Sequence, residues 1–106
     1  MEMEALQVAL AELDAGHPVV LATVVATRGS TPRRPGTKML LRSDGGTFGT
    51  IGGGCGEDEV RREALEVLHS GRPVLYRVDL TGGPADPGDR VCGGVMEVLV
   101  ERLDPR

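Results

Sequence analysis

The chain has 106 residues, a net charge of −4 and an apolar fraction of 40%, which suit one small domain with an aliphatic core. Its two aromatic residues and the lack of a long basic run exclude a platform for stacking bases, and they make nucleic acid and anionic membranes poor partners. No apolar run approaches the roughly 20 residues of a membrane helix, and the acidic start does not resemble a secretory signal. We therefore expect a cytoplasmic protein whose two cysteines are free thiols.

The first 27 residues predict a helix followed by a strand. Residues 3–14 read as a helix because four apolar residues recur at helical spacing. These are Met3, Leu6, Leu10 and Leu13. A glycine at position 16 and a proline at position 18 end the helix. Residues 19–27 are an almost continuous β-branched and apolar run, which is typical of a central strand covered on both faces.

Residues 28–36 predict a stiff loop, because they contain two prolines, two glycines and three arginines. Strands are then expected over 37–42 and 47–51, joined by a hairpin turn. The second of these strands leads directly into three glycines and a cysteine, Gly52-Gly53-Gly54-Cys55.

The second half of the chain predicts one helix and two strands. The helix spans about 57–69, and its buried stripe consists of Val60, Ala64, Val67 and Leu68. Strands follow over 74–80 and 95–103, separated by a polar loop that closes at Cys92 and two glycines. We therefore expect an α+β fold in residues 1–106, a single small domain with a mixed sheet of about five strands and two helices packed on it.

The glycine–cysteine stretch is the first candidate site. Gly52, Gly53 and Gly54 lack Cβ atoms, so a ligand could approach the backbone closely, or the chain could adopt positive φ. Cys55 stands at a helix N-terminus, where unpaired N–H groups favour a thiolate. The alternative is a tight strand-to-helix turn without chemistry. Cys92 is either a buried core cysteine or a neighbour of Cys55 in one site.

The arginine-containing loop is the second candidate site. Three acidic residues open the helix at 57–59 and would repel an anion there, so phosphate binding is assigned elsewhere. Arg33 and Arg34, which are flanked by prolines, are the preferred phosphate ligands. Arg28 and Lys38 rank after them as candidates. The alternative is ordinary solvated charge on a loop.

Three segments, 29–39, 49–57 and 91–94, taken in this order and spacing, resemble the N-terminal domain of the xanthine dehydrogenase accessory proteins, the XdhC/CoxI family. The resemblance implies a maturation factor or chaperone, not an enzyme. It implies that such a factor binds and protects the molybdenum cofactor and assists its insertion into a molybdenum hydroxylase, of the xanthine dehydrogenase or carbon monoxide dehydrogenase type. Most family members carry a second, dinucleotide-type domain, which we expect to be absent here.

The resemblance also implies a ligand and partners. Molybdopterin is an anionic phosphate ester whose dithiolene holds molybdenum, and Cys55 is the candidate soft ligand for that metal. The expected cofactor-binding residues are Cys55, Gly52, Gly53, Gly54, Arg33, Arg34, Cys92 and Lys38. The expected partners are a molybdenum hydroxylase subunit, a separate dinucleotide-type domain protein, and a second copy of this chain joined through an exposed sheet edge.

Two other functions stay open from the residues alone. One is a scaffold or interaction domain without cofactor binding. The other is a thiol enzyme that acts on a phosphate-bearing substrate through Cys55. Neither a Gly-x-Gly-x-x-Gly pattern nor a Gly-x-x-x-x-Gly-Lys-Ser/Thr pattern is present to support the enzyme, and no Cys–His pair is evident.

Overall fold

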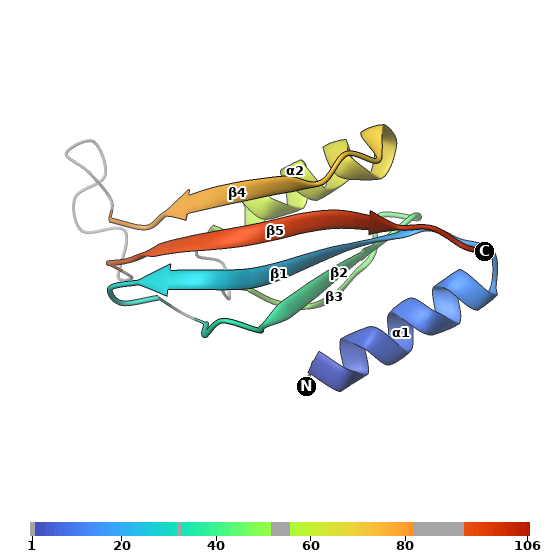
Figure 1. The fold of residues 1–106 in the computed structure, drawn as a ribbon, viewed down its shortest axis with the longest axis horizontal. Coiled ribbons are helices and arrows are strands. Elements are labelled where there is room, and N and C mark those ends of the chain that lie inside the picture. Colours follow the sequence, from blue (N-terminus) through green and yellow to red (C-terminus); the bar gives the residue numbers. More distant parts are fainter. Residues whose placement is uncertain (1, 32, 52–55, 82–92) are drawn as a thin grey trace.

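The computed structural model describes residues 2–31, 33–51, 56–81 and 93–106. In chain order the elements are α1 (Glu2–Asp14), β1 (Val19–Arg28), β2 (Lys38–Arg42), β3 (Thr47–Gly49), α2 (Glu57–Ser70), β4 (Val74–Asp79) and β5 (Val95–Leu103). The five strands form one sheet in the order β3-β2-β1-β5-β4 (Figure 1). The α+β class, the five strands and the two helices are confirmed. None of the helices in the described part is long and apolar enough to cross a membrane.

The pairing within the sheet is antiparallel throughout, where we expected a mixed sheet. Because each neighbouring pair is antiparallel, β1, β3 and β4 share one direction, and β2 and β5 run the other way. The connection through α2 therefore joins two parallel strands, as a helical crossover does. These two strands lie at opposite edges of the sheet, so no parallel neighbours arise.

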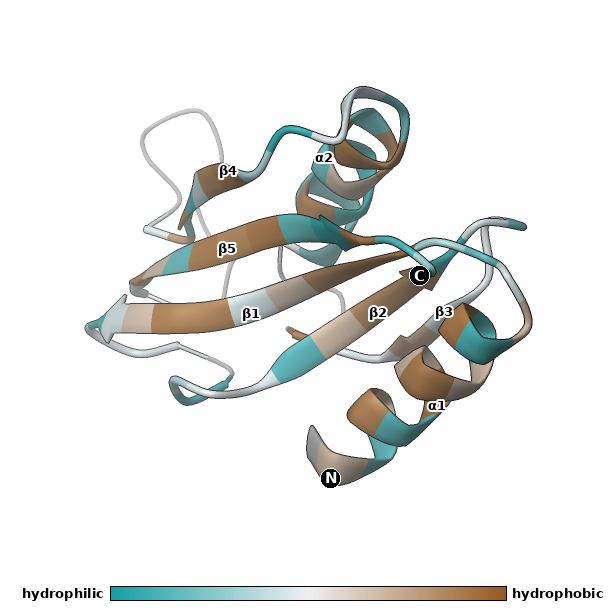
Figure 2. Cartoon of the chain, turned by 45° about the vertical axis from the view of Figure 1, so that its right-hand side comes forward, coloured by the Kyte–Doolittle hydropathy of each residue, from teal (hydrophilic) through white to brown (hydrophobic). Residues whose placement is uncertain are grey.

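The two helices cover opposite faces of the sheet, because the side chains of β1 alternate between them. On one face, Val20, Ala22 and Val24 belong to the larger core cluster, which includes the buried residues of α2. On the other face, Val19 and Leu21 belong to a smaller cluster with the α1 side chains. The sheet therefore lies between α1 and α2 (Figure 2), and the first half of β1 is buried on both faces, as its apolar run predicts.

The buried face of α1 differs from the predicted stripe. Ala5 and Ala9 are each 2% exposed, whereas Met3 is 68% and Leu10 is 60% exposed. Of the four predicted residues, Leu13 alone packs against the smaller cluster. Alanine lets the helix axis approach the strands closely, and this geometry turns the larger side chains outward.

The boundaries of α2 and β3 follow from their glycines. Three of the four residues in the predicted α2 stripe are fully buried, and the fourth, Leu68, packs partly against them. Gly71 ends α2 in the left-handed conformation, and its N–H donates to the Val67 carbonyl at 2.8 Å. Gly49, with φ of 82°, ends β3 two residues before the predicted strand end.

Candidate functional site

One end of the sheet brings together segments that are far apart in the sequence. There β1 ends and β5 begins, since Arg28 pairs with Val95, and β4 ends beside the same residue, since Asp79 also pairs with Val95. The N-terminus of α2 reaches this end as well. We call it the loop end, and it lies at the left of Figure 1. Its described residues are Arg28–Thr31, Gly56, Leu80 and Gly93–Gly94.

Glycines allow two segments of the loop end to pack backbone against backbone. The Gly93 N–H donates to the Ser30 carbonyl at 3.0 Å. A side chain on Gly94 would collide with the Arg28 carbonyl and the Thr31 side chain, and a Cβ on Gly29 would lie 3.1 Å from the Gly93 oxygen. The start of the loop after β1 and the residues just before β5 are therefore in direct contact.

Gly56 brings the start of α2 to the same place. It is the N-cap residue of α2, with φ of 77° and no side-chain cap hydrogen bond. A Cβ at this position would fall on the Cγ1 of Val78 and within 3.4 Å of the Leu80 side chain. Leu80 in turn donates its N–H to the Gly94 carbonyl at 2.8 Å. Residues from all three sequence segments, Gly29–Thr31, Gly56 and Gly93–Gly94, thus lie at the loop end.

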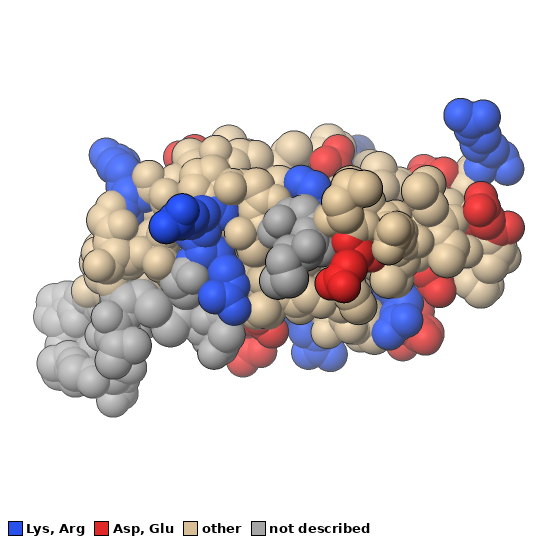
Figure 3. Space-filling view, turned by 90° about the horizontal axis from the view of Figure 1, so that it is seen from below, with Lys and Arg blue, Asp and Glu red and all other residues tan. Residues whose placement is uncertain are grey.

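Backbone hydrogen bonds hold the turn with Arg33 and Arg34 against β1. The Gly36 N–H donates to the Val24 carbonyl at 2.7 Å, and the Val24 N–H donates to the Thr37 carbonyl at 2.9 Å. The Thr37 N–H closes the turn on the Arg34 carbonyl at 3.2 Å. Both arginine side chains are exposed. Figure 3 views the molecule from the side of this turn and shows Lys and Arg side chains close together toward the loop end.

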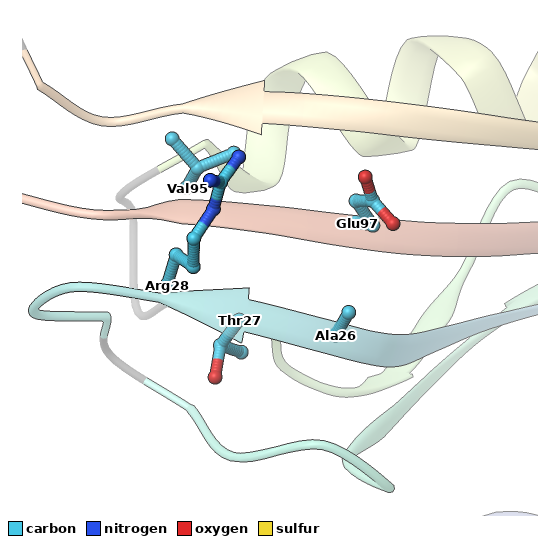
Figure 4. A pocket seen from close by; sticks show the side chains of 5 residues that line it. All are labelled: Ala26, Thr27, Arg28, Val95 and Glu97. Carbon is cyan, nitrogen blue, oxygen red and sulfur yellow. The ribbon is translucent and has the colours of Figure 1, made fainter.

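The other two basic candidates lie on the neighbouring strands. Lys38 begins β2 opposite Thr23 and is half-buried. Arg28 ends β1 and lines a cavity of about 190 Å³ together with Ala26, Thr27, Val95 and Glu97. Figure 4 shows its side chain reaching from β1 toward Val95 on β5. Arg28 thus lies at the end of β1, whereas Arg33 lies within the loop that follows it.

Two acidic side chains in the first turn of α2 accept hydrogen bonds from uncharged hydroxyl groups. The Thr50 hydroxyl donates to the Glu57 carboxylate, and the Tyr76 hydroxyl donates to Glu59 Oε1 at 3.0 Å. Burial raises the pKa of Tyr76 above its usual 10, and its hydrogen bond to Glu59 raises that pKa further. These acidic side chains lie in the first turn of α2, where negative charge complements the helix dipole.

Five of the predicted cofactor-binding residues lie outside the described residues: Gly52, Gly53, Gly54, Cys55 and Cys92. The structure places their flanking residues, of which Ile51 is fully buried and Gly56 and Gly93 belong to the loop end. Within the described ranges, no group of three or more His, Cys, Asp or Glu side chains is arranged to hold a metal ion.

Sequence reasoning missed the role of Gly29, Gly56 and Gly94 in bringing these segments together. The available signal was a glycine directly beside each candidate motif. Composition shows that such glycines are present, but it does not show which pairs of them pack against each other across the fold.

Comparisons with known proteins agree with the three segments. The model of the XdhC and CoxI family matches residues 12–79. The chain is 41% identical over 83 residues to the uncharacterized protein YqeB of Escherichia coli K12. This match covers 78% of this chain and 15% of YqeB. It is 36% identical over 98 residues to the molybdenum cofactor insertion chaperone PaoD of the same strain. This match covers 92% of this chain and 30% of PaoD.

A solved structure shows the same fold. It is the crystal structure of a xanthine dehydrogenase from Bacillus halodurans, which superposes with a TM-score of 0.81 at 31% identity. The match covers 97% of this chain and 30% of the other chain. The chain thus spans less than a third of the length of the relatives that it matches.

Proposed function

The chain belongs to the XdhC and CoxI family, and from that premise we propose that it binds the molybdenum cofactor at the loop end and assists its insertion into a molybdenum hydroxylase. The relative PaoD, which is named as a molybdenum cofactor insertion chaperone, supports this accessory role. The hydroxylase is of the xanthine dehydrogenase or carbon monoxide dehydrogenase type. The chain acts as a carrier, and it needs no catalytic group of its own.

The observation that carries the proposal is the glycine packing at the loop end. A carrier of a pterin needs a few polar groups that converge on one small region. The contacts of Gly94 with Arg28 and Thr31, and of Gly56 with Val78, bring the three family segments into that region. Cys55 directly precedes Gly56, and Cys92 directly precedes Gly93, so both thiols are one residue away from this packing in the chain.

The turn with Arg33 and Arg34 fits the phosphate of molybdopterin. Guanidinium groups bind phosphate oxygens through two parallel N–H donors, with better geometry than an ammonium. The turn is already fixed on β1 by the hydrogen bonds of Val24, so binding orders little additional backbone. Lys38 begins the strand that follows this turn and adds positive charge. Arg33 and Arg34 would thus hold the phosphate.

The bound cofactor would supply a molybdenum–dithiolene centre that accepts a soft ligand. We propose Cys55 as the residue that would supply this soft ligand, and Cys92 and the backbone of Gly52, Gly53 and Gly54 as further groups that would hold the cofactor. Arg33 and Arg34 would hold its phosphate.

Equilibrium titration of the purified chain with isolated molybdenum cofactor, under reducing anaerobic conditions, tests the phosphate subsite. We expect saturable binding, and at least a tenfold loss of affinity in the double variant Arg33→Glu/Arg34→Glu. Arg72→Glu is the matched control, because Arg72 follows α2 at the opposite end of the sheet. A wild-type chain that does not bind the cofactor, or a double variant that binds as tightly as wild type, would refute the proposal.

Comparing the cofactor with metal-free molybdopterin tests the thiol. Cys55→Ala should weaken binding of the metal-loaded form and leave binding of the metal-free form unchanged, because the thiolate contacts only the metal. Cys92→Ala should have a smaller effect in the same direction. Equal losses for both forms would instead assign Cys55 to the fold of the loop end.

Binding of the hydroxylase separates the carrier from a scaffold. A carrier should bind the cofactor-free hydroxylase more tightly when the chain itself is loaded. Equal affinity of the loaded and unloaded chain for the hydroxylase would favour an interaction domain without a cofactor role.

A further inference from the structure

The two edges of the sheet are built differently. At one edge β3 has three residues, and α1 packs along it. At the other edge β4 has six residues, Val74–Asp79, and pairs on one side with β5. Among the described residues, no strand lies beyond β4 (Figure 1). Its sequence, Val-Leu-Tyr-Arg-Val-Asp, contains no proline, glycine or lysine that would interrupt further pairing.

The register of β4 shows which of its backbone groups face outward. The Leu80 N–H donates to the Gly94 carbonyl at 2.8 Å, and the register continues without a shift back to Val74 opposite Val100. In an antiparallel ladder, hydrogen-bonded pairs alternate with pairs whose groups point away. Val74, Tyr76 and Val78 therefore bond to β5. The N–H and C=O groups of Leu75, Arg77 and Asp79 point outward.

The exposed side chains of this edge alternate in character. Leu75 is 60% exposed, and Arg77 and Asp79 are exposed as well. Asp79 accepts hydrogen bonds from the Thr81 N–H at 2.9 Å and from the Thr81 hydroxyl at 2.6 Å. These bonds hold the carboxylate at the end of the strand, two residues from the guanidinium of Arg77.

We propose that β4 pairs with β4 of a second copy of this chain, antiparallel and with Val78 opposite Val78 on the two-fold axis. In this register Arg77 of each copy lies opposite Asp79 of the other. Both residues carry outward backbone groups, so the two pairs are also hydrogen-bonded pairs. Opposite charges at such positions favour strand pairing.

The neighbouring registers are disfavoured by like charges. Residues whose backbone N–H and C=O groups point outward must face each other across the two strands. One strand can therefore shift along the other only by two residues at a time, and the positions that face each other are drawn from Leu75, Arg77, Asp79 and their neighbours two residues away. One step in one direction places Arg77 opposite Arg77, and one step in the other direction places Asp79 opposite Asp79. Both arrangements are repulsive. Charge complementarity therefore selects the pairing centred on Val78 and identifies a second copy as the partner.

The pairing has a consequence for the loop end. Val78 contacts Gly56, so the two-fold axis passes close to the start of α2 in both copies. The two loop ends would therefore lie side by side across the continuous sheet. The pairing itself follows from the β4 edge and does not depend on the cofactor proposal.

Sedimentation equilibrium of the purified chain across a range from roughly 1 µM to 1 mM tests the pairing. A single short strand buries little surface, so we expect a weak, concentration-dependent dimer. Arg77→Glu and Asp79→Arg should each weaken it by about thirtyfold, since each places like charges opposite each other twice. An equimolar mixture of the two variants should dimerise as wild type does, because each new side chain then faces its opposite charge.

One control variant separates pairing from other effects. Arg72→Glu makes the same charge change outside the strand and should leave the dimer unchanged. Circular dichroism should confirm that all variants fold. A chain that stays monomeric at 1 mM, or a mixture that does not recover the dimer, would overturn the proposal.

Discussion

Gly56 occupies a position where neither the backbone conformation nor the available space accepts a side chain. Its φ of 77° is left-handed, and a Cβ would meet the Val78 side chain. We predict that Gly56→Ala lowers the free energy of unfolding by about 3 kcal/mol, from about 1 kcal/mol of backbone strain and about 2 kcal/mol of overpacking. Urea unfolding followed by circular dichroism measures this loss.

Gly16 provides the matched control for this prediction. It also has a positive φ, 88°, but no atom would lie within 4 Å of an added Cβ. Gly16→Ala should therefore cost about 1 kcal/mol, from strain alone. In a double-mutant cycle, Val78→Ala should couple favourably with Gly56→Ala, because it removes the methyl that the new Cβ meets. Equal costs at Gly16 and Gly56 would show that packing against β4 contributes nothing.

Tyr76 connects β4 to α2, and its ionisation makes the free energy of unfolding vary with pH in the alkaline range. Its pKa is raised in the folded state by burial and by Glu59, so folding favours the neutral phenol. That stabilisation is complete below about pH 10, the value of the unfolded chain, and it is lost as the pH rises through the raised pKa. We predict that Tyr76→Phe costs about 1 kcal/mol at pH 8.

The difference between wild type and Tyr76→Phe should narrow as the pH rises above about 10. Urea midpoints of both proteins at pH 8, 9, 10 and 11 measure that difference while changes at other groups cancel. A difference that stays constant over this range would show that folding does not raise the pKa of the Tyr76 phenol.

At the scale of elements, α1 shows where apolar spacing misleads. The spacing correctly predicts a helix over these residues, but the face it marks is exposed at Met3 and Leu10. Alanine carries little weight in an apolar pattern, yet Ala5 and Ala9 are the residues that α1 buries, and Ala9 packs in the smaller cluster. The α2 stripe is predicted correctly because its larger side chains are themselves buried.

This difference gives a prediction for α1. Leu10→Lys should change the free energy of unfolding by less than about 0.5 kcal/mol, since the side chain is exposed. Ala9→Leu should lower it by about 2 kcal/mol, because the larger side chain must displace the strands beneath it. Thermal and urea unfolding compare the two variants. A larger loss for Leu10→Lys would mean that the helix packs through its predicted stripe.

At the scale of the whole molecule, local patterns predict the elements well and their arrangement poorly. The strand runs are recognisable because β1 and β5 are rich in β-branched residues. Their antiparallel pairing joins residues that are 67 to 84 positions apart in the sequence, which no local pattern encodes. The loop end has the same origin: Gly29 and Gly94 are 65 positions apart, and their packing depends on the sheet that joins them.

The two faces of the sheet should differ in local stability. Among the described residues, the cluster between the sheet and α2 contains fourteen buried residues, whereas the cluster toward α1 contains four. The two helices have nearly equal lengths, 13 and 14 residues, so length does not favour either one. We predict that α1 opens at a lower free energy than α2, and that the central strands β1 and β5 open last. Hydrogen exchange followed by mass spectrometry should show amides of α1 exchanging first. Exchange of α2 before α1 would contradict the prediction, because it would mean that the larger cluster does not hold the crossover helix to the sheet.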